Sequence, residues 1–288
     1  MRHVGIMRVV RDRFHPLYHA RQVPVIRTML AGADKAVWTR LEGIEWPVRV
    51  RVVRHASYLV RSTAPERKIA ALACALVDVL PIARFCDVGA NFGYYAWLLK
   101  SRSPDLAVDL VEPEPENLEL IDATLARTAL SDVVVHPVAA SYLSGRAVFQ
   151  RDLVSGATGS LEPASDSFAG RHWRSSASTE VATSTLDDLL SDKVDLLKID
   201  VEGHEERALS GARALLARDS PVVLFECYHG IHAAPAVLRR LGYELYDAEL
   251  FTEPTTVTTN YLAVPPTLRD RIPELRDAWR SSDVETRQ

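Results

Sequence analysis

Cysteine is scarce in this chain. Its 288 residues include only Cys74, Cys86 and Cys227, each in an apolar run and with no paired spacing between them. Such cysteines are typical of buried free thiols, which fit a reducing compartment and argue against a disulfide framework. No histidine adjoins any of them in the sequence, so a catalytic thiol is disfavoured as well.

Long apolar runs are also missing. The longest apolar stretch, from Ile69 to Val77, is far too short to span a membrane. The residues from Met1 to Arg8 lack the apolar core of a secretory signal peptide. The hydrophobic content of 47% is ordinary for a globular protein. We therefore expect a soluble, cytoplasmic protein.

The net charge of −4 conceals a basic N-terminal segment. Residues 1–61 contain eleven Arg and one Lys against four acidic residues, a balance of +8, so the remaining residues carry −12. The planar fork of arginine matches phosphate and carboxylate oxygens. Two interpretations stay open: an anionic partner, such as a phosphorylated or lipid-linked substrate, a membrane surface or RNA, or a segment packed against its own acidic domain.

A third glycine is missing from the most informative stretch. The apolar run Ile82–Cys86 is followed by Asp87, Gly89 and Gly93, which predicts a strand, a tight turn and a helix that begins at Tyr94. A dinucleotide fingerprint would read G-x-G-x-x-G, so a nicotinamide-dependent oxidoreductase is disfavoured. The aspartate would repel a pyrophosphate, but it suits the cationic end of a ligand such as S-adenosylmethionine.

Two later strand ends also carry acidic residues. The run from Val108 to Val111 predicts the next strand, and Glu112 follows it a little over twenty residues beyond Gly89. An acid at that point can accept hydrogen bonds from both ribose hydroxyls. A third strand over Asp195–Ile199 is followed by an Asp, a Glu and a His within five residues. Such a cluster is hard to explain by structure alone.

Together these stretches resemble the FkbM family of S-adenosylmethionine-dependent O-methyltransferases. The motifs are Asp87–Gly93, Val111–Pro113 and Lys198–Glu205, with Gly211 closing the helix that follows, and the resemblance covers roughly residues 85–265. It implies an α/β, Rossmann-like class I fold: a mostly parallel seven-stranded sheet with a terminal antiparallel strand and helices on both faces. The cofactor residues that it implies are Asp87, Gly89, Ala90, Asn91, Gly93, Glu112, Pro113, Val138, Ala139 and Asp200.

Transfer of a methyl group to a hydroxyl requires a base that removes the acceptor proton as the new bond forms. His204 is the predicted base, because its unperturbed pKa lies near working pH. Asp200 would orient the acceptor or the methionine amine, and Glu202 would hold the imidazole tautomer. In an alternative arrangement Asp200, Glu202 and Glu226 bind Mg²⁺. The histidine in the cluster favours the metal-free version, so we predict no metal.

The expected acceptor is a hydroxyl of a small molecule or glycan, such as a sugar, a glycolipid or a secondary metabolite. Two alternatives are a non-catalytic cofactor-binding module with an anionic partner and an RNA methyltransferase. The sequence lacks the Asn/Asp-Pro-Pro-aromatic motif typical of base aminomethylation, which disfavours nucleic acid. We expect residues 1–61 to contribute to binding of the acceptor, which could be anionic or lipid-linked, rather than of the cofactor. Peripheral membrane contact and a homodimer are further interpretations of that segment.

The predicted organisation has three parts. Residues 1–65 form a basic segment that is helical with a β-ribbon, residues 66–265 form the methyltransferase domain, and residues 266–288 form a polar tail with a short helix and a frayed end. The ribbon would pair Pro47–Val52 with Ser57–Val60.

Three further expectations concern the methyltransferase domain. Residues 151–178 are rich in Ser, Ala and Gly and predict an irregular loop, a candidate lid. A single helix is predicted from Glu202 to Ala217. The strands Tyr243–Tyr246 and Asn260–Val264 are separated by too short a connection for a crossover helix and should pair antiparallel.

Overall fold

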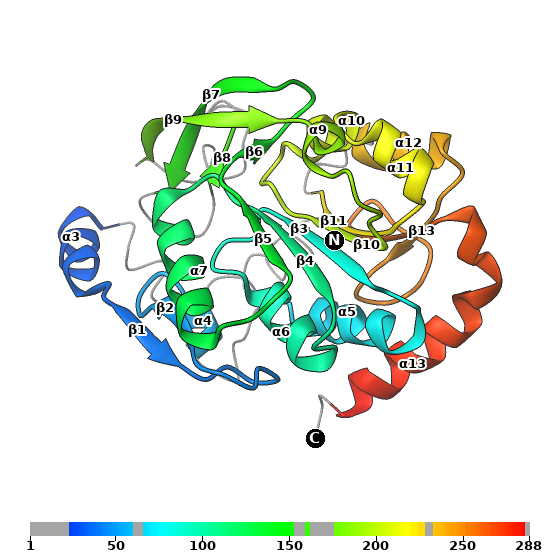
Figure 1. Ribbon diagram of the computed structural model, residues 1–288, viewed down its shortest axis with the longest axis horizontal. Coiled ribbons are helices and arrows are strands. Elements are labelled where there is room, and N and C mark those ends of the chain that lie inside the picture. Colours follow the sequence, from blue (N-terminus) through cyan, green and yellow to red (C-terminus); the bar gives the residue numbers. More distant parts are fainter. Residues whose placement is uncertain (1–22, 60–65, 153–158, 162–175, 228–232, 286–288) are drawn as a thin grey trace.

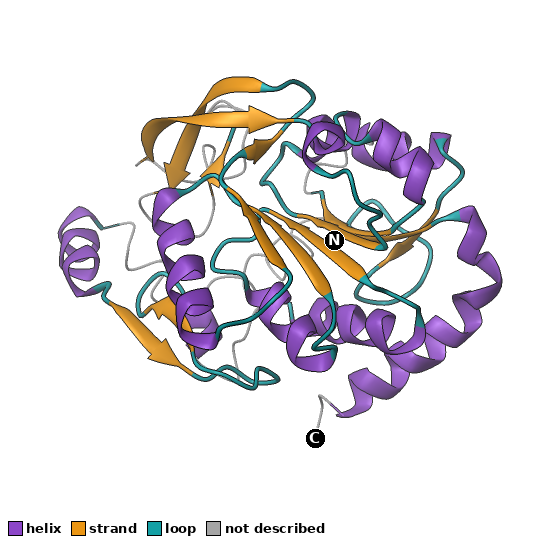
Figure 2. Cartoon of the chain, in the orientation of Figure 1, coloured by secondary structure: helices purple, strands orange, loops and turns teal. Residues whose placement is uncertain are grey.

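A seven-stranded sheet forms the centre of the computed structural model, which describes residues 23–59, 66–152, 159–161, 176–227 and 233–285 (Figures 1 and 2). The strand order is β12-β13-β11-β10-β3-β4-β5. Only β13 runs antiparallel to its neighbours, β11 and β12. The strands are β3 (Arg84–Val88), β4 (Ala107–Val111), β5 (Val133–His136), β10 (Leu196–Ile199), β11 (Val222–Glu226), β12 (Glu244–Asp247) and β13 (Asn260–Val264).

This architecture confirms the predicted Rossmann-like fold. The antiparallel pairing of the last two strands is confirmed as well. The reversed strand, β13, is last in the chain but lies one place in from the edge of the sheet, because β12 takes the outer position.

Helices cover both faces of the sheet (Figure 1). Side chains of successive strand residues point to opposite faces, so Leu196 packs in one core cluster and Leu197 in the other. The first face carries α5 (Arg67–Val79), α6 (Tyr94–Arg102), α7 (Pro115–Thr128) and α13 (Ile272–Glu285). The second carries α9 (Leu186–Leu189), α10 (Glu205–Ser210), α11 (Arg213–Asp219) and α12 (Ala233–Arg240).

The N-terminal ribbon is built differently from the prediction. After α3 (Pro24–Ala33), β1 (Ala36–Thr39) pairs antiparallel with β2 (Val48–Arg51), so the partner of the predicted strand precedes it in the chain. Ser57–Leu59 belongs to a short helix, α4 (Ala56–Leu59), and Val60 lies outside the described residues. The side chain of Asp34 accepts hydrogen bonds from the backbone N–H groups of Val53 and Arg54, which turns the chain out of the strand.

A second, four-stranded sheet lies beside the main one at the upper left of Figure 1. Its strands are β6 (Ala139–Ala140), β7 (Gly145–Asp152), β8 (Gly159–Ser160) and β9 (Ser176–Ser184). Parts of the predicted lid therefore belong to strands. The remainder of that prediction, residues 153–158 and 162–175, lies outside the described residues.

Two helical predictions also need correction. The predicted helix over residues 202–217 is two helices, α10 and α11, that meet at Gly211, where a Cβ would lie 2.0 Å from the carbonyl oxygen of Ser141. The helix predicted near residues 274–280 is confirmed but is longer: a 3₁₀ turn, η2 (Pro266–Arg271), leads into α13 (Ile272–Glu285), and residues 286–288 of the predicted frayed end lie outside the described residues. That helix buries three apolar side chains in the first core cluster, namely Ile272, Leu275 and Trp279.

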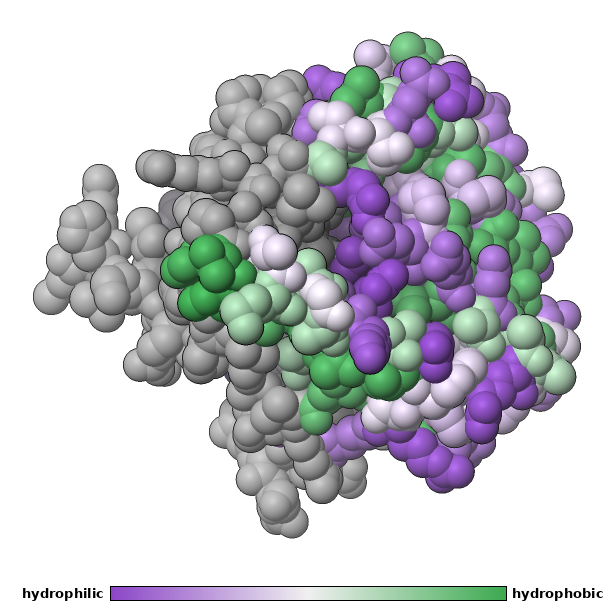
Figure 3. All heavy atoms as spheres, turned by 90° about the vertical axis from the view of Figure 1, so that its left-hand side faces the viewer, coloured by the Kyte–Doolittle hydropathy of each residue, from purple (hydrophilic) through white to green (hydrophobic). Residues whose placement is uncertain are grey.

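The outer face of the N-terminal segment mixes hydrophilic and apolar residues (Figure 3). Val25 and Met29 of α3 are about seven-tenths exposed. No helix within the described ranges has the length and apolar character that a bilayer crossing requires.

Candidate active site

A cavity of about 220 Å³ opens at the carboxyl ends of β3, β4 and β10. It is far larger than the space that one water needs, so it can hold an organic ligand. All but one of the predicted site residues line it; the exception is Gly93, and the others are Asp87, Gly89, Ala90, Asn91, Glu112, Pro113, Val138, Ala139, Asp200, Glu202 and His204.

The glycines after β3 are explained by packing. Gly89 has φ +82°, and a Cβ on it would lie 2.0 Å from the backbone oxygen of Asp200. The turns after β3 and β10 therefore touch at the backbone, which only glycine allows. Gly93 has φ +85° and begins α6, and a Cβ there would meet the indole ring of Trp97 at 2.6 Å. Gly89 therefore shapes the cavity wall, whereas Gly93 allows the start of α6 to pack against Trp97.

Asp87 ends β3 and is 1% exposed. Neither of its carboxylate oxygens has a hydrogen-bond partner among the described residues. Burial raises the pKa of Asp87 to about 6; the charge of Lys198 opposes this shift, and the charges of Asp200 and Glu66 add to it. A buried carboxylate with unsatisfied oxygens in a cavity fits a cationic group of a ligand.

Glu112 ends β4 and is also buried. Its two oxygens accept hydrogen bonds from the backbone N–H groups of Asn91 (2.8 Å) and Glu114 (2.9 Å). The side-chain amide of Asn117 donates a third bond, at 3.3 Å. Burial raises the pKa of Glu112 to about 7, although these hydrogen bonds pull it down. The carboxylate is thus held in one orientation, with acceptor capacity left for a ligand.

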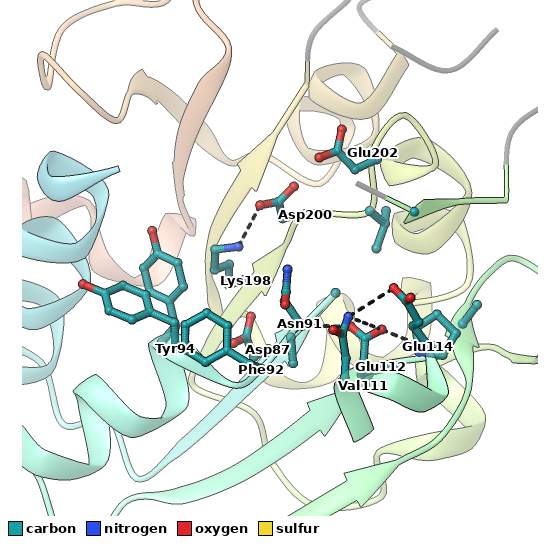
Figure 4. A pocket seen from close by; sticks show the side chains of 18 of the residues that line it. Asp87, Asn91, Phe92, Tyr94, Val111, Glu112, Glu114, Lys198, Asp200 and Glu202 are labelled. Carbon is teal, nitrogen blue, oxygen red and sulfur yellow. Dashed lines mark hydrogen bonds and ion pairs between the residues drawn. The ribbon is translucent and has the colours of Figure 1, made fainter. Parts of the chain in front are cut away.

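Lys198 forms the centre of the opposite wall (Figure 4). Its ammonium lies 3.1 Å from Asp200 Oδ2 and 4.7 Å from the ring centre of Tyr95. Burial alone would lower the pKa of Lys198, but the charges of Asp200, Asp87 and Glu66 raise it above its usual value. From its sequence context, Lys198 is predicted to be a strand residue that either reaches solvent or pairs with an acid; the structure shows the second, as a buried ion pair with Asp200.

The turn after β10 presents the predicted catalytic cluster. Glu202 has φ +53°, and its carbonyl oxygen accepts a hydrogen bond from the Ser160 hydroxyl. His204 is 3% exposed, and its Nε2 lies 3.0 Å from Ser141 Oγ. Glu205 closes the turn by accepting from the backbone N–H of Gly203 at 2.9 Å, and burial raises the pKa of Glu205 to about 7.

A second group of acids lies beside Asp200. Carboxylate oxygens of Glu66, Asp200 and Glu226 come within 4.8 Å of one another. Glu66 also accepts a hydrogen bond from the Tyr95 hydroxyl at 2.8 Å. The alternative magnesium set proposed from the sequence included Glu202, but in the structure Glu66 takes its place beside the other two. Glu66 was missed because it precedes a helix outside the three motifs.

The N-terminal segment forms part of the cavity wall through Val53, Arg54 and residues 56–58. Arg54 makes ion pairs with Glu114 at 3.2 Å and with Glu116 at 2.8 Å, and Arg151 of β7 pairs with the same two acids. The segment therefore lies against the acids that follow β4, and its expected role in acceptor binding stays a prediction. At least part of its arginine excess is balanced by its own acidic domain.

Residues 87–245, more than half of the chain, match the model of the methyltransferase FkbM domain. The chain belongs to the FkbM methyltransferase family. The match identifies residues 87–245 as a methyltransferase domain. None of the curated proteins matches it.

Solved structures with a similar fold include the FkbM methyltransferase of Methylobacillus flagellatus KT, with 20% identity and a TM-score of 0.44. That likeness covers 63% of this chain but only 43% of the Methylobacillus protein, so the chain spans less than half of its length. A precorrin-6y C5,15-methyltransferase of Geobacter metallireducens GS-15 has 12% identity, a TM-score of 0.40, and coverage of 68% of this chain and 87% of its own. The tRNA (uracil-54, C5)-methyltransferase of Pyrococcus abyssi, in complex with S-adenosyl-L-homocysteine, has 12% identity, a TM-score of 0.41, and coverage of 79% and 43%.

Proposed function

We propose that this FkbM methyltransferase transfers a methyl group from S-adenosylmethionine to a hydroxyl of a small molecule or glycan. The observation that carries the proposal is the buried, unpartnered carboxylate of Asp87, in one cavity with the oriented carboxylate of Glu112. When bound, S-adenosylmethionine supplies an already activated methyl group. The protein has to align the acceptor oxygen and remove its proton.

The cofactor roles follow from the chemistry of these two acids. Asp87 would hold the cationic methionine end, because its carboxylate lacks any other cation within hydrogen-bond distance among the described residues. Glu112 would accept hydrogen bonds from the ribose hydroxyls, as strand-end acids do in related nucleotide sites. Val138 and Ala139, which also line the cavity, would contact the adenine.

The acceptor roles are proposed for the turn after β10. Asp200 would orient the acceptor hydroxyl, and the ion pair with Lys198 holds its carboxylate in place. His204 would accept the proton, with Glu202 beside it on the same turn. The Ser141 hydroxyl can bond His204 Nε2 in either direction, so it is compatible with the neutral imidazole that a base requires.

The charge of the cavity supports an uncharged acceptor. Both of its described cationic side chains, Arg54 and Lys198, are already paired with acids of the same wall. Its acidic residues are more numerous: Glu66, Asp87, Glu112, Glu114, Asp200 and Glu202. An anionic acceptor, or an RNA backbone, would meet net repulsion there. This argues against the anionic acceptor that the basic segment suggested.

An acceptor screen tests this proposal. The purified protein with S-adenosylmethionine should add one methyl mass to neutral sugars or hydroxylated metabolites, and not to their phosphorylated counterparts. Cofactor binding with no turnover on any acceptor would favour the non-catalytic alternative. Turnover confined to phosphorylated acceptors or RNA would overturn the proposed acceptor class.

The role of His204 has its own test. His204→Ala should lower turnover by about 10²–10⁴-fold, the usual contribution of a positioned base, while cofactor affinity measured by calorimetry stays near wild type. A matched control is His136→Ala, because His136 pairs with Asp109 away from the cavity. If His204→Ala stays active while a chelator abolishes activity and Mg²⁺ restores it, the acids beside Asp200 bind a metal and the assignment to His204 is wrong.

A further inference from the structure

Part of the cofactor site comes from outside the matched family domain. The match begins at residue 87, yet His55 of the N-terminal segment reaches the turn after β3. Its ring is 1% exposed and packs on Phe92, with ring centres 4.5 Å apart. A buried histidine in this place could simply fill space, but its two nitrogens make directed contacts that define a role.

The proton on the His55 ring can be located from its partners. The backbone N–H of Arg51 points at His55 Nδ1 at 3.0 Å. A backbone amide can only donate, so Nδ1 must be the acceptor and carries no proton. The neutral ring then has its proton on Nε2, which lies 3.1 Å from Asn91 Oδ1 and donates to it.

Asn91 lies in the turn after β3 and connects His55 to Glu112. It adopts φ +54°, a left-handed conformation that asparagine tolerates but that still needs support. Its backbone N–H donates to Glu112 Oε2 at 2.8 Å. The side-chain bond from His55 therefore fixes the residue whose backbone orients the predicted ribose-binding carboxylate.

We propose that His55 is a positioning residue of the cofactor site, neutral with its proton on Nε2, which holds Asn91 and through it Glu112 in the geometry that binds S-adenosylmethionine. This inference rests on the proposed cofactor roles of those two residues. It assigns to the N-terminal segment a part in cofactor binding that the family match does not contain.

The tautomer can be observed without any ligand. Two-dimensional ¹⁵N–¹H spectra of the full chain, with the His55 ring signals identified by their loss in His55→Phe, should show the Nε2–H form. A proton on Nδ1 in the free protein would overturn the proposal. This measurement of the tautomer does not depend on methyl transfer, so it stays informative if the proposed function fails.

Affinity separates positioning from space filling. His55→Phe keeps an aromatic ring against Phe92 but makes neither hydrogen bond, and it should weaken S-adenosylmethionine binding by roughly tenfold when affinity is measured well below the melting temperature of the variant. His55→Gln restores a donor toward Asn91 and should recover most of that loss. The control is His136→Phe, whose histidine bonds Asp109 away from the cavity. Wild-type affinity in His55→Phe would overturn the proposal, even if its stability fell.

A double-mutant cycle tests whether His55 acts on cofactor binding through Asn91. Asn91→Ala should weaken binding by itself, and adding His55→Phe to it should cost little more, because the two residues act through one hydrogen bond. Fully additive losses would show that His55 acts on the cofactor independently of Asn91, and the proposal would be wrong. If the wild-type protein does not bind S-adenosylmethionine at all, the proposed function fails first, while the spectra still decide the tautomer.

Discussion

Two buried carboxyls dominate the site at the scale of single residues. Asp87 and Glu112 are almost fully shielded from water, and burial raises their pKa values to about 6 and about 7. Their difference lies in their partners: Glu112 accepts three hydrogen bonds from protein groups, whereas Asp87 accepts none among the described residues. The carboxylate of Glu112 is therefore oriented by the protein before any ligand binds, and the carboxylate of Asp87 is left for a ligand.

The pKa of Asp87 predicts how cofactor affinity depends on pH. Below about 6 the carboxyl is neutral, and above that value it is an anion that attracts a cationic ligand. We expect S-adenosylmethionine affinity to rise as pH increases from about 5 to 7, with proton release on binding at the lower end. Calorimetry in buffers of different ionisation enthalpy measures both. A loss of affinity over this range would contradict the assignment, and Asp87→Asn should flatten the profile.

Glu112 can be tested by truncation. Glu112→Ala leaves ribose hydroxyls without an acceptor in a buried site, which should weaken cofactor binding by about 1–3 kcal/mol. Glu119→Ala is the matched control, because Glu119 lies exposed on the helix that follows. Titration calorimetry compares the two variants with the wild type. Equal affinity in all three would reduce Glu112 to a structural acid.

Some residues of the site can be predicted from the sequence and others cannot. Both outcomes have a physical reason. Asp87, Glu112 and Asp200 each follow an apolar strand directly, and parallel strands bring such positions to one edge of a sheet. Glu66 lines the same cavity and His55 contacts Asn91 of its wall, and both come from segments at no fixed distance from any motif. Their contacts depend on how the chain folds back, which no local pattern encodes.

At the scale of elements, strands and helices of the central domain could be predicted because their apolar patterns are strong. The partner of β2 could not, since both β1 and the stretch after His55 are short and rich in the β-branched or aromatic residues that fit a ribbon. The prediction of one helix over residues 202–217 was wrong because its apolar pattern continues past Gly211, although the family resemblance had that glycine closing a helix; in the structure Gly211 lies against the backbone of Ser141. Secondary structure is thus predicted wrongly where contacts with segments far away in the sequence determine the local conformation.

The contact between the turns after β3 and β10 gives a prediction at this scale. Gly89→Ala places a Cβ 2.0 Å from the backbone oxygen of Asp200 and forces a left-handed alanine, so it should destabilise the fold by about 2–5 kcal/mol. Gly32→Ala is the control: no atom lies within 4 Å of the added Cβ in α3, and stability should stay equal or rise slightly. Urea denaturation compares them. A Gly89→Ala protein as stable as the control would refute this packing.

At the scale of the whole molecule, the three predicted parts share one core. The first core cluster joins Val48 and Val50 of the N-terminal ribbon, Leu72 of α5 and Trp279 of α13. Ion pairs add to the packing between the N-terminal segment and the domain, because Arg54 pairs with acids at the start of α7. Within the described residues, Arg51 and Arg54 of the basic segment are thus paired with acids of the domain that follows.

A shared core predicts that the C-terminal helix is needed by the whole chain. Trp279 is 7% exposed and packs edge-on against Phe251, with ring centres 6.1 Å apart. Trp279→Ala should cost about 3–5 kcal/mol and lower the melting temperature in a single transition that includes the N-terminal ribbon, because no separate core would survive it. Arg280→Ala, an exposed neighbour on the same helix, should change little. Hydrogen exchange resolved along the sequence checks this. If α13 alone lost protection while Val48 and Val50 kept theirs, the C-terminal segment would be the dispensable tail that its composition suggests.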